Sequence, residues 1–125
     1  MALISIDPEM ELEYIPKFER ENSKDPLIVK LKFMNHAEYI EYISVMTREM
    51  GTTTDPEKQS RISKAHDRKK FIEHVVGFEN WNKLDGTKEK NDAGAFYDRN
   101  ETNLIYEIQS AYREVSVLTD GQRKN

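Results

Sequence analysis

The chain has 125 residues, of which 37% are hydrophobic and 34% charged, and its formal net charge at neutral pH is −4. This length suits one domain with a modest core, and the acidic balance argues against a general nucleic-acid binder, whose surface is usually basic. The chain has no cysteine, which suits a reducing cytoplasm. With no secretion signal and no apolar stretch near the length of a membrane span, we expect one soluble, cytoplasmic α+β domain over residues 1–125.

Alternating residues near the N-terminus predict two β-strands. From Glu9 to Tyr14, three glutamates alternate with apolar residues, a period of two that is typical of a strand with one face in water. From Leu27 to Phe33, apolar residues alternate with Lys30 and Lys32. We expect an antiparallel hairpin or small sheet, over about residues 10–18 and 27–34, with glutamates opposite lysines on the exposed face.

A capping pattern predicts the first helix. Asn35 and Glu38 have the spacing of a capping box, and Gly51 provides an end. Tyr39 and Tyr42 flank the apolar stripe of this helix, and we expect them to cover the edge of the sheet. The stripe itself consists of Ala37, Ile40, Ile43, Met46 and Met50.

A second helix is predicted to begin at Asp55-Pro56-Glu57, where Asp55 caps the helix and proline takes the first position. It carries a run of five basic residues: Arg61, Lys64, Arg68, Lys69 and Lys70. Two interpretations of its end stay open. Either the helix continues to Gly77, or residues 71–78 form a short strand.

Residues 82–100 are polar and predict a long loop, which is either functional or disordered. We expect Phe96 and Tyr97 to anchor this loop in a helical turn. A last helix is predicted from Asn100 as cap to Gly121 as stop, and we expect it to be the most buried element. Its apolar stripe consists of Leu104, Ile105, Ile108, Ala111, Tyr112, Val115 and Leu118. The chain thus predicts a small sheet followed by about three helices.

No pattern of residues indicates catalysis or metal binding. His66 and His74 are two helical turns apart, about 12 Å along a helix axis, which is too far for them to share a metal ion, and His36 belongs to another element. The chain has no cysteine nucleophile, no nucleophile elbow and no phosphate-binding glycine loop. We therefore expect no enzymatic activity, no metal and no cofactor.

Two groups of residues are candidates for binding a partner. The basic run over residues 61–70 fits phosphates or an acidic protein surface, or it is a solvated face that offsets the acidic N-terminal half. No aromatic residue interrupts the run, so base stacking gains no support. The second group is either core or a partner and self-association surface: Tyr39, Tyr42, Met46, Met50 and Tyr106.

The order of elements supports a resemblance. A strand at Pro26–Leu31 leads into a short helix, a basic helix runs into Phe71–Asn80, and a loop with Asp85-Gly86 precedes the last helix and Gly121–Asn125. From Pro26 onward, the chain resembles small proteins encoded among the tail genes of tailed bacteriophages and prophages, particularly tail assembly chaperones.

The resemblance implies a non-enzymatic protein in the cytoplasm of the bacterial host. Such a protein binds and shields the tape-measure protein, or another phage tail protein, until the tail tube assembles. Two alternatives stay open: a nucleic-acid-associated regulator that uses residues 61–70, and a small structural tail or connector protein. We also expect self-association, because several thin apolar stripes share one small core.

Overall fold

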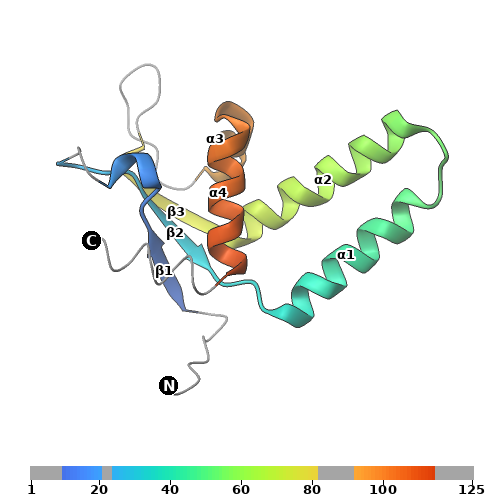
Figure 1. Cartoon of the computed structure of the whole chain (residues 1–125), viewed down its shortest axis with the longest axis horizontal. Helices are drawn as coiled ribbons and strands as arrows, with labels where there is room; N and C mark the ends of the chain where they lie inside the picture. Colours follow the sequence, from blue (N-terminus) through green and yellow to red (C-terminus); the bar gives the residue numbers. More distant parts are fainter. Residues whose placement is uncertain (1–9, 21–23, 82–91, 115–125) are drawn as a thin grey trace.

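The structure is a small antiparallel sheet with a helical hairpin extending from it (Figure 1). It is a computed structural model, and it describes residues 10–20, 24–81 and 92–114. The elements are β1 (Glu11–Tyr14), the 3-10 helix η1 (Lys17–Glu19), β2 (Ile28–Lys32), α1 (His36–Met50), α2 (Pro56–His74), β3 (Val75–Glu79), α3 (Ala93–Arg99) and α4 (Thr102–Arg113). The strand order is β1-β2-β3. This confirms the α+β class, with an N-terminal strand pair followed by helices.

The pairing of β1 with β2 has the predicted register. Glu11 lies opposite Lys32 and Glu13 lies opposite Lys30, while the apolar residues between them face the core. The predicted strand over residues 10–18 is too long, because β1 ends at Tyr14 and η1 follows Pro16. The carboxylate of Glu107 on α4 accepts hydrogen bonds from the Tyr14 hydroxyl at 2.5 Å and from the backbone N–H of Lys17 at 2.8 Å, which fixes this change of direction.

The third strand decides between the two interpretations left open for residues 71–78. The helix ends at His74 and the chain continues directly into β3, so the helix does not continue to Gly77, and the predicted strand begins only at Val75, not at Phe71. Val75 pairs with Leu31 and Phe78 pairs with Val29, which requires a bulge at Lys30/Leu31. An extra residue on one strand of a pair allows two side chains three positions apart to share a face. Both Val75 and Phe78 are therefore buried.

The C-terminal part of the described chain holds two helices where the sequence predicted one. Within the predicted loop, α3 begins after Asp92, whose side chain accepts a hydrogen bond from the N–H of Ala95 at 2.9 Å. Asn100 ends α3 and does not cap the next helix, because its side-chain amide donates to the carbonyl of Phe96 at 3.0 Å. The last helix, α4, begins at Thr102. The predicted loop residues 82–91 lie outside the described residues.

The end of α4 also differs from the prediction. Glu114 has an extended backbone, so the helix does not run through it toward Gly121, and residues 115–125 lie outside the described residues. The carbonyl of Tyr112 instead accepts the N–H of Met34 at 2.7 Å. Met34, in the connection from β2 to α1, therefore donates to a carbonyl that would accept an intrahelical hydrogen bond if α4 were longer.

The core lies between the sheet, the end of α2, α3 and α4. Half the residues of α4 are buried, the largest share of any described helix, as expected. The predicted apolar stripe of α1 is wrong as a core face, because α1 has no buried residue and Ile40 is 48% exposed. The members of the buried cluster are Tyr14, Leu27, Val29, Leu31, Met34, Phe71, Val75, Phe78, Ala93, Phe96, Leu104, Ile105, Ile108, Ala111 and Tyr112.

The α1–α2 hairpin is defined by local chemistry at its ends. The Asn35 side chain accepts the N–H of Glu38 at 2.8 Å, and the Asp55 side chain accepts the N–H of Glu57 at 3.0 Å, which confirms both predicted caps. In the turn between the helices, the Gln59 side chain donates to the carbonyls of Met50 and Thr53. The ends of the hairpin therefore depend on polar groups close in sequence.

We predict that Ile108→Ala lowers the free energy of unfolding by about 2–5 kcal/mol, because the fully buried side chain leaves a cavity in the core. Urea unfolding followed by circular dichroism measures the change. Ile40→Ala is the matched control and should change stability by about 0.5 kcal/mol or less, because Ile40 is 48% exposed. Equal losses in the two variants would contradict this description of the core.

Candidate functional site

An open groove of about 660 Å³ lies between α2, the end of α3 and the start of α4. One wall is a single face of α2, with lining residues at helical spacing: Pro56, Gln59, Ser60, Ser63, Lys64 and Asp67. The other wall is formed by Tyr97, Asn100, Thr102, Ile105 and Tyr106, and Met50 at the end of α1 completes the lining.

The sequence of α2 explains why this face stays open. The only buried residues of α2 are Phe71 and His74, both near its C-terminal end. Toward its N-terminal end, small polar side chains such as Ser60 and Ser63 face the groove and provide little apolar area to cover. Tyr106 on the opposite wall is 58% exposed. The groove thus combines a shallow polar wall with an accessible aromatic side chain.

The Asp67 carboxylate forms the fixed base of the groove. It accepts hydrogen bonds from the Tyr97 hydroxyl at 2.7 Å and the Gln109 amide at 2.8 Å, and a longer one from the Tyr42 hydroxyl at 3.5 Å. These partners come from α3, α4 and α1, so one side chain of α2 connects the four α-helices among the described residues.

The tyrosines around Asp67 hold their protons more strongly than usual. Burial, followed by the negative charge of Asp67, raises the pKa of Tyr42 to about 12. Burial and the hydrogen bond to Asp67 raise the pKa of Tyr97 well above its usual range. The neutral hydroxyls are therefore stable donors to the carboxylate. Sequence analysis did not select Asp67 or Gln109 and named Tyr97 only as an anchor of the predicted loop, although Asp67 is the single acid within the basic run.

The five predicted basic residues do not form one patch of free charge. Arg68 makes two hydrogen bonds to Asp98, at 3.0 and 3.1 Å, which hold the pKa of that carboxyl below its usual range. Lys70 lies 3.0 Å from a carboxylate oxygen of Glu73. Arg61 lies 3.9 Å from Glu57, at the limit of an ion pair. Among the residues that the structure describes, the two exposed lysines Lys64 and Lys69 have no ion pair.

The predicted aromatic and methionine surface is likewise divided. Met50 and Tyr106 line the groove together with Lys64, so residues of both predicted groups meet there. Tyr39 packs against the core, Tyr42 binds Asp67, and Met46 is half-buried. The structure therefore brings together three of the ten candidate residues at this groove.

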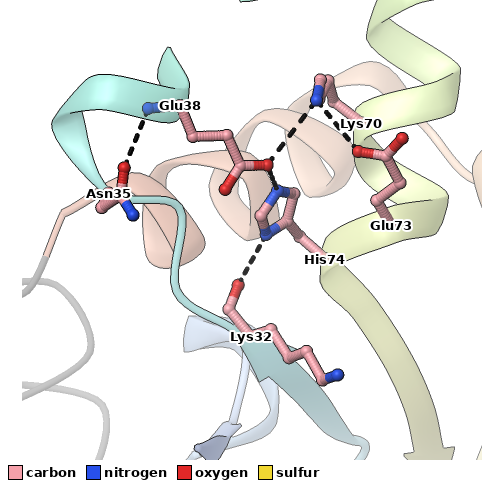
Figure 2. Close-up of polar contacts among 6 residues, drawn as sticks. All are labelled: Lys32, Asn35, Glu38, Lys70, Glu73 and His74. Atoms are coloured by element: carbon pink, nitrogen blue, oxygen red, sulfur yellow. Dashed lines mark hydrogen bonds and ion pairs between the residues drawn. The ribbon is translucent and has the colours of Figure 1, made fainter. Parts of the chain in front are cut away.

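A second polar cluster joins the base of the α1–α2 hairpin to the sheet (Figure 2). The buried His74 ring contacts the Lys32 carbonyl through Nδ1 at 2.9 Å and the Glu38 carboxylate through Nε2 at 2.6 Å. The Lys32 carbonyl can only accept a hydrogen bond, so Nδ1 donates to it. Lys70 lies 3.6 Å from the same carboxylate. Glu38, predicted as part of a capping box, thus directs its carboxylate to α2.

The same cluster is a candidate metal site. Ligand atoms of Glu38, Glu73 and His74 all lie within 4.8 Å of one another. Two ligands of a tetrahedral zinc ion would be roughly 3.3 Å apart, whereas the His74 and Glu38 atoms are 2.6 Å apart. The ammonium of Lys70 already bridges the two carboxylates. We therefore interpret the cluster as a network of hydrogen bonds and ion pairs around Lys70 and His74.

Comparisons with protein-family models, curated proteins and solved structures give no match for this chain. In the part of the chain that the structure describes, no helix has both the length and the hydropathy needed to cross a membrane. The functional argument therefore rests on the groove and on the polar contacts that hold its walls.

We predict that Glu38→Gln destabilises the protein by about 1–3 kcal/mol, because the buried His74 ring loses its carboxylate partner. Urea unfolding measures the loss, and hydrogen exchange should show weaker protection at the start of α1. Glu73→Gln is the control and should cost no more than about 1 kcal/mol, since Glu73 is exposed and pairs only with Lys70 among the described residues. Equal effects in the two variants would argue against a structural role for the His74–Glu38 bond.

We predict that stability falls as the pH rises from 10 toward 12, because the pKa of Tyr42 is about 12 in the folded protein and 10 in its unperturbed state. A raised pKa means that the folded state holds the Tyr42 proton more tightly than the unfolded state. The stabilisation from this proton is complete below pH 10 and is lost progressively between pH 10 and about 12. Urea unfolding at several alkaline pH values measures the slope. Tyr42→Phe should make this slope shallower; an unchanged slope would contradict the prediction.

Proposed function

We propose that this protein is a non-enzymatic, helix-binding protein that acts as a phage tail assembly chaperone. In this proposal it holds helical segments of the tape-measure protein until tail assembly. The observation that carries the proposal is the meeting of Met50, Tyr106 and Lys64 in one open groove. Two of these residues supply apolar contact and the third supplies charge.

The dimensions of the groove favour a helical partner. The lining face of α2 runs from Pro56 to Asp67, which corresponds to roughly 16 Å along the helix axis, or about three helical turns. Small side chains at Ser60 and Ser63 allow a partner helix to approach α2 closely. A helix laid in a groove between helices is a common mode of peptide recognition.

The side chains of the groove suit a partner that must later be released. Methionine is flexible and polarisable, so Met50 adapts to different apolar side chains. Tyr106 offers a broad aromatic face, and 58% of its surface is accessible before binding. Surfaces of this kind bind many related sequences without strong commitment to one. A chaperone that covers successive segments of a long client needs this property.

The alternative functions receive less support from the contacts. Nucleic-acid binding through residues 61–70 would use basic side chains, but Arg68 and Lys70 are paired with acids of the same chain. No contact among the described residues favours a structural tail or connector protein. Self-association stays a prediction, with Tyr39, Tyr42 and Met46 now placed at half-covered positions.

We predict that co-expression with the tape-measure protein of the same phage keeps that client soluble and gives a complex on size-exclusion chromatography. Tyr106→Ser should reduce recovery of the complex, because it removes the main exposed aromatic contact of the groove. Ile40→Ser is the matched control, since Ile40 is also exposed but does not line the groove. A client that is equally soluble without this protein, and no complex, would refute the proposed function.

A further inference from the structure

We infer that the partner helix of this groove is acidic on one flank, so that its carboxylates pair with Lys64 while its apolar side chains pack on Met50 and Tyr106. The inference rests on the proposed function and specifies the chemistry of the partner.

Lys64 supplies the charged group of the groove lining that remains available for a direct ion pair. The groove lining contains two charged side chains, Lys64 and Asp67. The Asp67 carboxylate already accepts hydrogen bonds from three side chains of this chain. The exposed Lys64 has no ion pair among the residues described. An incoming carboxylate therefore finds an available ammonium group, whereas an incoming ammonium group finds a carboxylate that is already occupied.

A second basic group extends this charge along α2. Arg61 lies three residues before Lys64, so both side chains project toward neighbouring parts of the same helix surface. The Arg61 side chain is 73% exposed, and its contact with Glu57 is 3.9 Å long. Two carboxylates one helical turn apart on a partner can therefore face Lys64 and Arg61 together.

The two walls of the groove determine how the partner must be patterned. Lys64 lies on the α2 wall and Tyr106 on the opposite α4 wall. One helix between them meets Lys64 with one flank and Tyr106 with the other. The fitting sequence is therefore an amphipathic helix with acidic residues beside its apolar stripe on the α2 side.

The net charge of the chain makes this pairing selective. The protein carries a formal charge of −4, so its overall charge opposes the approach of an acidic helix. Because the rest of the protein is negative on balance, attraction to Lys64 favours binding of the partner helix at the groove over binding elsewhere. Charge complementarity of this kind contributes more to orientation and specificity than to affinity.

Two fluorescein-labelled peptides test the inference. They share one apolar stripe and a length of about four helical turns, and they differ only in carrying glutamates or lysines on one flank. Fluorescence anisotropy with the full chain should show the glutamate peptide binding at least about tenfold more tightly than the lysine peptide. Added salt should reduce the difference.

A matched pair of charge reversals assigns the preference to one residue. Lys64→Glu should abolish or invert the preference, because it places a negative charge in the groove. Lys69→Glu should preserve the preference, since Lys69 is exposed on the same helix but does not line the groove. Circular dichroism confirms that both variants are folded.

The outcomes separate the inference from the proposed function. Equal binding of the two peptides, or equal effects of Lys64→Glu and Lys69→Glu, would overturn the acidic partner. If that binding is nevertheless lost in Tyr106→Ser, the groove still binds helices and only the inferred charge pattern is wrong. If neither peptide binds, the inference fails, and the co-expression experiment then decides the proposed function on its own.

Discussion

The arrangement of the helices depends on the carboxylate of Asp67. This side chain on α2 accepts hydrogen bonds from Tyr42 on α1, Tyr97 on α3 and Gln109 on α4. Apolar packing contributes little along most of α2, whose buried residues are confined to its C-terminal end. Directional hydrogen bonds to one charged group therefore fix α1 and α2, which bury few residues, relative to α3 and α4. Removing one partner leaves a costly unsatisfied group.

The His74–Glu38 bond is the second such constraint, and it acts where α2 becomes β3. It links the first turn of α1 to the sheet through the carbonyl of Lys32. Asp67 and His74 are two helical turns apart on α2, so the hairpin is held at two points roughly 10 Å apart. A polar contact of this kind, between the buried His74 and the partly exposed Glu38, adds little net stability compared with apolar packing. We interpret its contribution here as fixing one orientation of the hairpin.

These two constraints also determine which charges remain available to a partner. Sequence analysis treated residues 61–70 as one basic surface, but the fold commits Arg68 to Asp98 and Lys70 to Glu38 and Glu73. Lys64 remains accessible in a groove beside Tyr106. Internal pairing thus converts a run of positive residues into a smaller and more specific surface. It also places that charge next to apolar groups, where a protein helix is a better fit than a phosphate backbone.

The sequence by itself determined the features that depend on nearby residues. The caps at Asn35 and Asp55 and the facing of glutamates and lysines on β1 and β2 follow from chemistry within a few positions or from strict alternation. Tertiary structure decided the rest. The end of α2 at His74 and the bulge opposite β3 depend on pairing with β2, and the exposure of Ile40 depends on which face of α1 meets α2. The groove joins Lys64 to Tyr106 across elements distant in sequence. Local periodicity describes one face of one element, but only packing determines which faces meet and which stay open.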